Sequence, residues 1–205
     1  MRYGMVIDTK RCFGCMACAV TCKSANGLPD DIWWNKIYTV GGESDDAAGG
    51  VYPNLERHYT PVSCQNCESP ACVAVCPTGA SYVDETTGIV SIDIEVCIGC
   101  QLCDTACPYK ARMYNSEEPT WNHGFKSGYS DAPDHLPTKA SKCTYCANRL
   151  AQGEAPACMH LCPGRARFFG DFDDPTSEVS QLIEARENYR LMEEQGTDPS
   201  VFYLK

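Results

Sequence analysis

The sequence predicts an α+β fold in which two related units carry long loop insertions and are followed by a C-terminal helix. A long repeat is the first reason. Residues 7–22 (IDTKRCFGCMACAVTC) align with residues 92–107 (IDIEVCIGCQLCDTAC), 85 positions later, and keep Ile, Asp, Gly and all four cysteines. A second repeat relates residues 70–80 (PACVAVCPTGA) to residues 156–166 (PACMHLCPGRA), 86 positions later. Because a fixed period marks a repeated structural unit, we expect an internal duplication.

The elements expected within the units are short. The segments CAVTC (18–22) and CDTAC (103–107) predict one helical turn each, which would carry the last cysteine about 6 Å beyond the preceding one. An apolar strand at residues 81–83, a turn through 87–88 and a second strand at 89–92 predict a hairpin between two cysteine motifs.

A longer helix is expected near the C-terminus. Asp174 is a suitable N-cap, apolar side chains follow at helical spacing, and Gly196 is a suitable terminator. This pattern predicts one helix between those two residues.

Composition and charge exclude two classes of protein. The 205-residue chain has a net charge of -10, from 27 acidic and 17 basic side chains, whereas nucleic-acid binding requires basic surfaces. No run approaches the roughly 18 apolar residues of a membrane span, so we expect none. The first residues lead directly into a cysteine motif, so we also expect no export signal in this chain.

The cysteines carry most of the chemical information. All sixteen fall into four quartets, each of which opens with Cys-x2-Cys and closes with Cys-x3-Cys. The quartets are Cys12, Cys15, Cys18, Cys22; Cys64, Cys67, Cys72, Cys76; Cys97, Cys100, Cys103, Cys107; and Cys143, Cys146, Cys158, Cys162. Three of them end in Cys-Pro, and only Cys22 is followed by another residue, Lys23.

Iron-sulfur clusters explain this spacing better than disulfides or zinc. Thiols so close in sequence would close only short loops as disulfides, which add little stability. Zinc knuckles use Cys-x2-Cys pairs but do not require a third cysteine and a terminal Cys-Pro. The tight run is typical of [4Fe-4S] proteins, in which the fourth cysteine binds a neighbouring cluster. His160 is not needed as a ligand, because the cysteine set is complete.

Two glycines fit the same interpretation. Gly14 and Gly99 stand between the first two cysteines of their quartets, where the missing Cβ would let the backbone approach an inorganic core. Together with the hairpin, these motifs indicate a two-cluster ferredoxin-like core at about residues 62–114.

At this point the chain resembles a known family. The sixteen cysteines, the opening VIDTKRC, the segment CPYKARMYN and the tail RFFGDFDDPTSEVSQLI followed by DPSVFYL are similar to the four-cluster electron-transfer (beta) subunit of the complex iron-sulfur molybdoenzymes. That group includes the beta subunits of dimethyl sulfoxide, polysulfide and tetrathionate reductases and of pyrogallol transhydroxylase. The resemblance covers nearly the whole chain.

The resemblance implies four [4Fe-4S] clusters, each completed by a cysteine from another quartet. The implied ligands are Cys12, Cys15, Cys18 and Cys162 for cluster 1; Cys64, Cys67, Cys72 and Cys107 for cluster 2; Cys97, Cys100, Cys103 and Cys76 for cluster 3; and Cys143, Cys146, Cys158 and Cys22 for cluster 4.

We therefore expect a four-cluster ferredoxin-type domain over residues 1–172. One unit would span about 62–114, and the other would be assembled from about 1–30 and 140–172. Residues 173–205 would add the C-terminal helix and an extended tail.

The function implied by the resemblance is that of an electron-transfer subunit. It would relay single electrons between a molybdopterin (Mo or W) catalytic subunit and another redox partner, either a membrane anchor subunit or a soluble electron donor. The sequence contains no Ser-His-Asp pattern, phosphate loop or dinucleotide motif, so we expect no catalytic site in this chain. A free-standing soluble polyferredoxin carrier and a structural zinc protein are the alternative functions.

The location is also implied only indirectly. Family members without a signal are commonly exported in folded form with a catalytic subunit that bears a twin-arginine leader. The resemblance thus implies an extracytoplasmic, membrane-associated protein, and a cytoplasmic relative would have the same sequence features.

Four cations follow the Cys-Pro turns, and their role stays open. Lys110, Arg112, Arg165 and Arg167 would tune cluster potentials if they were close to the clusters, and ordinary solvated surface is an equally good interpretation.

Overall fold

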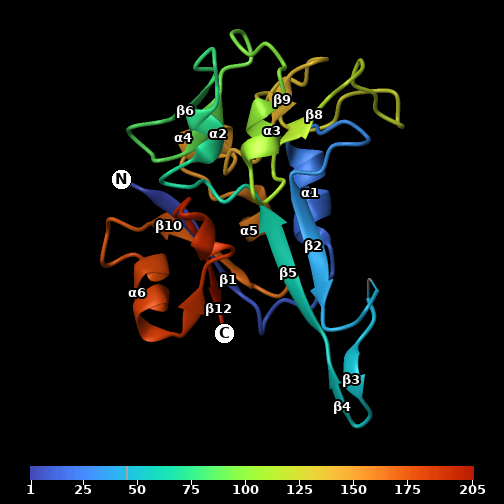
Figure 1. Ribbon diagram of the computed structural model, residues 1–205, viewed down its shortest axis with the longest axis vertical. Coiled ribbons are helices and arrows are strands. Elements are labelled where there is room, and N and C mark those ends of the chain that lie inside the picture. The colour runs from blue at the N-terminus through green and yellow to red at the C-terminus, as the bar shows by residue number, and fades with distance from the viewer. Residues whose placement is uncertain (45) are drawn as a thin grey trace.

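The largest sheet joins the two ends of the chain. The computed structural model describes residues 1–44 and 46–205. In its four-stranded sheet the order is β10 (Arg167–Asp171), β1 (Tyr3–Asp8), β12 (Val201–Leu204) and β11 (Asn188–Tyr189). Strand β1 pairs antiparallel with β10 and parallel with β12, and the three strands lie together in Figure 1.

Both faces of β1 are covered. Met5 and Ile7 belong to the main core together with Tyr203, whereas Val6 points to the other side and packs against Val179. These side chains are almost completely buried. A strand covered on both faces can be apolar at successive positions instead of alternating, which accounts for its sequence YGMVID.

The predicted hairpin is present. Strands β6 (Ser81–Val83) and β7 (Val90–Ile92) pair antiparallel, and the second strand begins one residue later than expected. The pair β10 and β1 occupies the corresponding place beside the other cysteine motifs. Its register also corresponds, because Ser81 faces Ile92 in one pair and Arg167 faces Ile7 in the other, at positions related by the two repeats.

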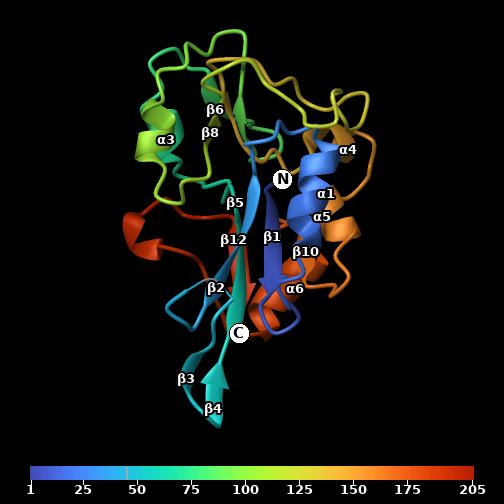
Figure 2. The ribbon, with the colours of Figure 1, turned by 90° about the vertical axis from the view of Figure 1, so that its right-hand side faces the viewer.

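The predicted helical turns are also present. They form α1 (Ala17–Ala25) and α3 (Leu102–Ala106), and further short helices lie within the other two quartets. The latter are α2 (Ala71–Ala74), α4 (Ala147–Ala151) and α5 (Ala157–His160). Helix α1 packs against α5 and α2 against α3, and Figure 2 shows the first pair side by side.

The residue after the last cysteine determines the length of these helices. Helices α2, α3 and α5 end one or two residues before Cys76, Cys107 and Cys162, each of which precedes a proline that disfavours helical backbone at the cysteine. Lys23 replaces this proline after Cys22, and α1 continues to Ala25. The Lys23 ammonium group then donates to the carbonyls of residues 29, 30 and 32, at 2.6, 2.8 and 3.1 Å.

Two insertions extend from this core. Strands β2 (Asn35–Val40) and β5 (His58–Ser63) form a long antiparallel ladder, beyond which the hairpin of β3 (Gly49–Val51) and β4 (Asn54–Glu56) projects from the molecule (Figure 1). Strands β8 (Met113–Tyr114) and β9 (Ala140–Ser141) close the base of the second insertion. This insertion packs back on the end of α1, where Trp121 donates to the Gly27 carbonyl at 3.0 Å.

The C-terminal helix is shorter than predicted. Helix α6 spans Glu178–Ala185, and a separate 3-10 turn, η1 (Glu193–Gln195), ends at Gly196. Asp174 does not cap α6, because its carboxylate accepts the backbone N–H of Thr176 in a preceding turn. Ser177 is the N-cap and accepts the N–H of Ser180 at 3.3 Å.

The segment after α6 returns to the main sheet. Strands β11 and β12 pair with each other and β12 pairs with β1, so the expected boundary after residue 172 separates strands of one sheet. The tail is therefore a structural part of the domain core. Within the described residues, no helix has both the length and the apolar character needed to cross a membrane.

Candidate iron-sulfur sites

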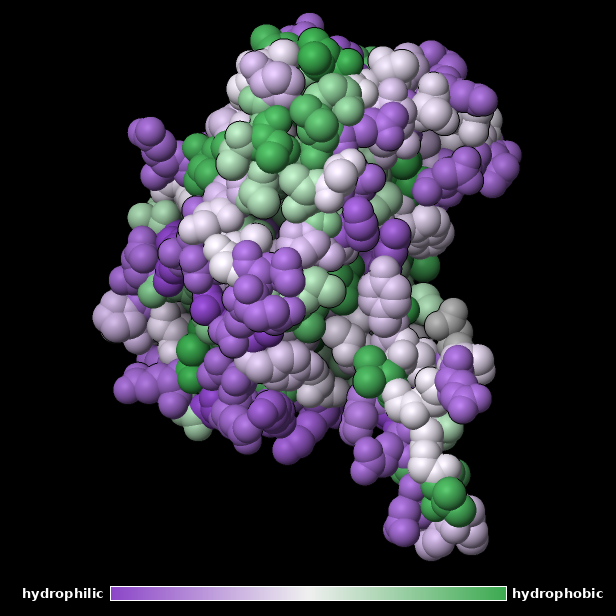
Figure 3. Space-filling model, viewed as in Figure 1, coloured by the Kyte–Doolittle hydropathy of each residue, from purple (hydrophilic) through white to green (hydrophobic). Residues whose placement is uncertain are grey.

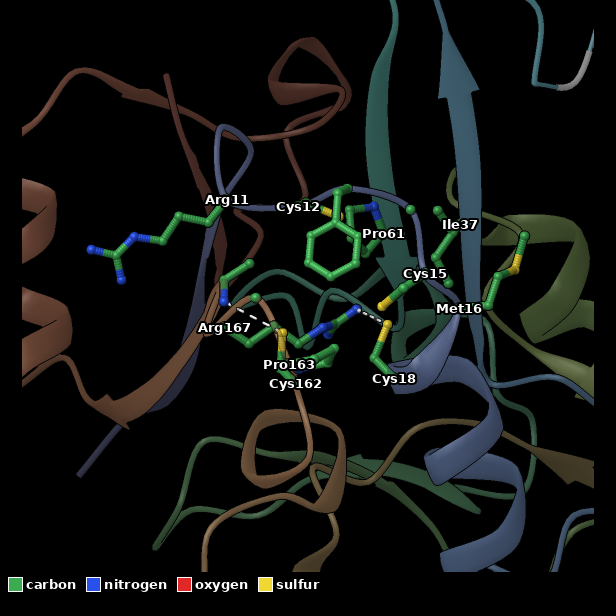
Figure 4. A pocket seen from close by; sticks show the side chains of 14 residues that line it. Arg11, Cys12, Cys15, Met16, Cys18, Ile37, Pro61, Cys162, Pro163 and Arg167 are labelled. Atoms are coloured by element: carbon green, nitrogen blue, oxygen red, sulfur yellow. Dashed lines mark hydrogen bonds between the residues drawn. The ribbon is translucent and has the colours of Figure 1, made fainter.

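The cysteines assigned to cluster 1 line one cavity. The loop before α1 contributes Cys12 and Cys15, the first turn of α1 contributes Cys18, and the turn after α5 contributes Cys162. Figure 4 shows side chains from these two distant segments turned towards one another. Residues more than 140 positions apart in sequence are thus brought to the same site by the pairing of β1 with β10.

The cluster 3 cysteines line a second cavity. Its lining includes Cys76, Cys97, Cys100 and Cys103. Here the hairpin of β6 and β7 brings the two motifs together.

The remaining two sets lie in the interior. Cys22 is close enough to interact electrostatically with Cys143, Cys146 and Cys158, the other members of the cluster 4 set. Burial, reinforced by these neighbouring thiols, raises the pKa of Cys22 well above its ordinary value. The same causes raise the pKa of Cys143 to about 12.

The cluster 2 cysteines form the second interior set. Cys67 interacts with Cys64, Cys72 and Cys107. Burial is the largest cause that raises the pKa of Cys67 to about 12. Buried thiols of this kind become thiolates only when a cation binds them, so metal loading must release their protons.

Some sulfurs receive backbone hydrogen bonds. The Ser81 N–H donates to the Cys76 Sγ and the Ala166 N–H to the Cys162 Sγ, both at 3.4 Å. Burial raises the pKa of Cys76, but the N–H of Ser81 and the hydroxyl and N–H of Thr78 outweigh it, so this pKa lies below its ordinary value. These donors stabilise the thiolate form that an iron ligand requires.

All sixteen cysteines are free in the structure. In the part of the chain that the structure describes, no three His, Cys, Asp or Glu side chains are grouped tightly enough to hold a single metal ion. The cysteines of the cluster 1 and cluster 3 sets instead line cavities.

Three buried cations beside the cysteine sets indicate that these sets accept an anionic group. Arg112, Lys142 and Arg167 are 3%, 1% and 4% exposed, and no carboxylate lies within 4.0 Å of them in residues 1–44 and 46–205. All three lie beside cysteines. Arg112 donates to the Cys72 Sγ at 3.0 Å and Lys142 to the Cys143 carbonyl at 2.7 Å.

The pKa values of the two arginines agree with such a partner. Burial lowers the pKa of each guanidinium, but the neighbouring thiolates, Cys72 for Arg112 and Cys158 for Arg167, more than reverse this effect, so both pKa values are raised. A buried charge without a counter-charge is strongly unfavourable. A cluster held by four thiolates carries negative charge, so the residues present fit [4Fe-4S] groups.

The structure also resolves the open question about the four cations. Lys110 and Arg165 are exposed, whereas Arg112 and Arg167 are buried against sulfur ligands. His160 is exposed. The sequence could not separate these residues, because all four cations follow the same kind of turn.

Sequence reasoning missed two further residues beside the interior sites. Tyr145 is 1% exposed and interacts electrostatically with Cys143, Cys64 and Cys67, which places it between the cluster 4 and cluster 2 sets. Asn26 points its amide towards the Cys22 Sγ at 3.6 Å. The only available signal was their position one to four residues from a ligand cysteine.

Comparison with known proteins agrees with this geometry. The 4Fe-4S dicluster domain matches residues 55–124 and 131–172. A relative from Halobacterium salinarum bears the name of a dimethyl sulfoxide reductase iron-sulfur subunit; it is 43% identical over 98% of this chain and 78% of its own. A polysulfide reductase polypeptide of Wolinella succinogenes is 37% identical over 99% and 94%. The arsenate respiratory reductase iron-sulfur subunit of a Shewanella strain is 35% identical over 100% and 97%.

The fold and the sites define a four-cluster ferredoxin-type protein with four [4Fe-4S] groups. More narrowly, the chain belongs to the iron-sulfur (beta) subunits of the complex iron-sulfur molybdoenzymes, as the sequence resemblance implied.

Proposed function

We propose that this chain relays single electrons between a molybdopterin catalytic subunit and a second redox partner. When bound, [4Fe-4S] groups supply one-electron redox chemistry. The observation that carries the proposal is the presence of four sets of four thiols in one continuous fold, within a chain that matches iron-sulfur subunits along almost its entire length.

Each of the four proposed ligand sets combines three cysteines of one quartet with the last cysteine of another. Two sets rest on the cavity lined by Cys12, Cys15, Cys18 and Cys162 and on the cavity around Cys76, Cys97, Cys100 and Cys103. The interactions of Cys22 with the last quartet, and of Cys107 with Cys64 and Cys72, support the other two sets.

The sites follow one another in a line. Cys143 interacts with Cys64, so the cluster 4 and cluster 2 sets are neighbours at the centre of the molecule. Clusters 1 and 3 are then the two outer members. Tyr145 fills the space between the central sets and keeps water out of it.

Apolar side chains surround both outer sites and are suited to partner docking. Phe13 and Met16 are 58% and 48% exposed beside the cluster 1 cysteines, and Ile98 and Leu102 are 65% and 47% exposed beside those of cluster 3. Figure 3 shows hydrophobic side chains gathered over the region of α2 and α3. We assign the catalytic subunit to one end and the second partner, a membrane anchor or a soluble donor, to the other.

The chain has no catalytic site of its own and acts only within a multi-subunit reductase. It lies outside the cytoplasm at a membrane, after export with a catalytic subunit that bears a twin-arginine leader. Its two units, about 62–114 and about 1–30 with 140–172, arose by internal duplication, which the common register of β6–β7 and β10–β1 supports.

Anaerobic purification of the tagged chain from its native source tests the function. We expect a pterin-containing subunit to co-purify, with about sixteen iron atoms in this chain, four for each cluster. A fully loaded chain that is isolated alone and exchanges electrons freely with small carriers would support the soluble polyferredoxin instead. Zinc without acid-labile sulfide would overturn both.

A further inference from the structure

The buried arginines make closely similar contacts in the two units. Arg112 donates from Nη2 to the Cys72 Sγ and from Nη1 to the Ser81 Oγ, both at 3.0 Å. Arg167 donates from Nη2 to the Cys18 Sγ at 3.4 Å and to the Asn35 Oδ1 at 3.0 Å. Figure 4 shows the Arg167 guanidinium reaching Cys18 across the cluster 1 cavity.

Each guanidinium lies between the two clusters of its unit. Besides Cys72 of cluster 2, Arg112 contacts Ser81, which lines the cluster 3 cavity, and it interacts electrostatically with Cys103 of that cluster. Besides Cys18 of cluster 1, Arg167 approaches the Cys158 Sγ of cluster 4 at 3.9 Å. The cysteines touched also correspond, because each of them is the third member of its quartet.

The two arginines do not occupy equivalent positions in the repeat. Arg167 aligns with Ser81, and Arg112 aligns with Gly27. Ser81 accepts a hydrogen bond from Arg112. The Arg112 guanidinium therefore lies at the position that is equivalent to Arg167 in the other unit, although it comes from a different place in the sequence. Packing alone would not require a cation at the same place from two different sequence positions, each without a carboxylate partner.

We propose that Arg112 and Arg167 are equivalent redox-tuning residues, each shared by the two clusters of one unit. Reduction adds negative charge to a cluster, and an arginine, which stays protonated, favours that charge in an interior of low dielectric constant. Its N–H groups also donate to the sulfur ligands, a contact that raises cluster potentials. Because one cation faces two clusters, it raises both potentials together. This inference rests on the four clusters of the proposed function.

Single substitutions test the assignment on the full, cluster-loaded chain. We expect Arg112→Gln to lower the midpoint potentials of clusters 2 and 3, and Arg167→Gln those of clusters 1 and 4, in an EPR-monitored redox titration. Two of the four titration steps should move in each variant. Lysine at the same positions should keep the midpoint potentials close to their wild-type values, because the charge is retained.

The neighbouring exposed cations provide matched controls. Lys110→Gln and Arg165→Gln remove the same charge two residues away, but solvent screens those side chains. All four potentials should stay unchanged in both controls.

Two further variants keep the test decisive if the glutamine variants fail to assemble. Asn35→Asp and Ser81→Asp retain the arginines. Each replaces the side chain that accepts a hydrogen bond from a guanidinium with a carboxylate. Each should lower the same two potentials as the corresponding arginine substitution. The double variant with Ser81→Arg and Arg112→Gly, which copies the arrangement of the other unit, should return clusters 2 and 3 towards their original potentials.

Iron and acid-labile sulfide measured on each sample distinguish failure of the proposed function from failure of the tuning role. A wild-type chain without four clusters would remove the proposed function and this inference with it. Fully loaded variants in which no potential moves, or in which all four move equally, would overturn the inference and leave the proposed function intact.

Discussion

Arg186, which follows helix α6, forms an ion pair with Asp8 at the end of β1, with the Arg186 Nη1 2.5 Å from the Asp8 Oδ2. The Asp8 carboxylate is 3% exposed and also accepts the N–H groups of Lys10 and Arg11, so it fixes the turn that leads into the first cysteine motif. The C-terminal segment thereby holds the start of the cluster 1 loop in place.

We expect Asp8→Asn to destabilise the loaded protein by about 2 kcal/mol, because it removes a buried charged hydrogen bond and leaves Arg186 without its partner. Anaerobic urea unfolding measures this loss. Asp173→Asn is the control, since Asp173 is 54% exposed and its ion pairs are at the surface, so a change of no more than about 0.5 kcal/mol is expected. Equal effects of the two substitutions would contradict the role of Asp8.

The ion pair of Asp8 and Arg186 also predicts that the free energy of unfolding depends on pH. Burial raises the pKa of Asp8, but Arg186 and the N–H groups of Arg11 and Lys10 outweigh it, so this pKa lies below its ordinary value of 3.8. The folded state therefore binds the proton less readily than the unfolded state. The contribution of ionised Asp8 to the free energy of unfolding is complete at pH values above the ordinary pKa. It is lost as the pH falls through the lowered pKa of the folded state.

Unfolding of wild type and Asp8→Asn as a function of pH checks the sign. The difference in unfolding free energy should be constant between about pH 8 and pH 5 and should shrink below about pH 4. A difference that increases on acidification would contradict the assignment.

The crossed ligand sets predict that two serine substitutions damage different clusters. Cys22→Ser should damage cluster 4, because Cys22 lies with Cys143, Cys146 and Cys158. Cys162→Ser should damage cluster 1, whose cavity it lines. Each variant should fall from about sixteen to about twelve iron atoms and lose a different EPR signal. Loss of cluster 1 in Cys22→Ser, with cluster 4 intact, would show that each quartet binds its own cluster.

Two glycines with similar backbone angles should respond differently to alanine. Gly99 has a φ of +68°, and a Cβ there would overlap the Thr138 carbonyl oxygen. Gly79 has a φ of +69° with nothing within 4 Å of an added Cβ. Gly79→Ala should therefore cost about 1 kcal/mol of backbone strain, whereas Gly99→Ala should also displace the loop and impair cluster 3. Matching iron contents and EPR spectra for the two variants would contradict this difference.

The sequence was sufficient to predict the local elements and the iron-sulfur class. The cysteine spacing, the hairpin at residues 81–92 and the helical turns in the motifs depend on neighbouring residues, and all are present in the structure. The reason predicted for Gly14 and Gly99 was incomplete, because both have positive φ and an added Cβ would first meet protein atoms, those of Tyr59 and Thr138.

Features that depend on distant contacts could not be predicted. The helix expected from Asp174 to Gly196 ends at Ala185, because the chain then turns to join β12 and Arg186 pairs with Asp8. Burial of Arg112 and Arg167 is also invisible in the sequence. An arginine after Cys-Pro has the same local pattern whether it points to solvent or to sulfur, and only the packed fold separates the two.

The central position of β1 also has a consequence for biosynthesis. A ribosome releases residues 62–114 with all the cysteines proposed for clusters 2 and 3, so these can be metallated while translation continues. The motif at residues 12–22 emerges first but must wait for Cys162 and Cys143, and β1 gains its parallel neighbour only with the last residues of the chain. Maturation of the outermost N-terminal cluster thus runs against the order of synthesis, and the oldest thiols of the nascent chain need protection from oxygen for longest.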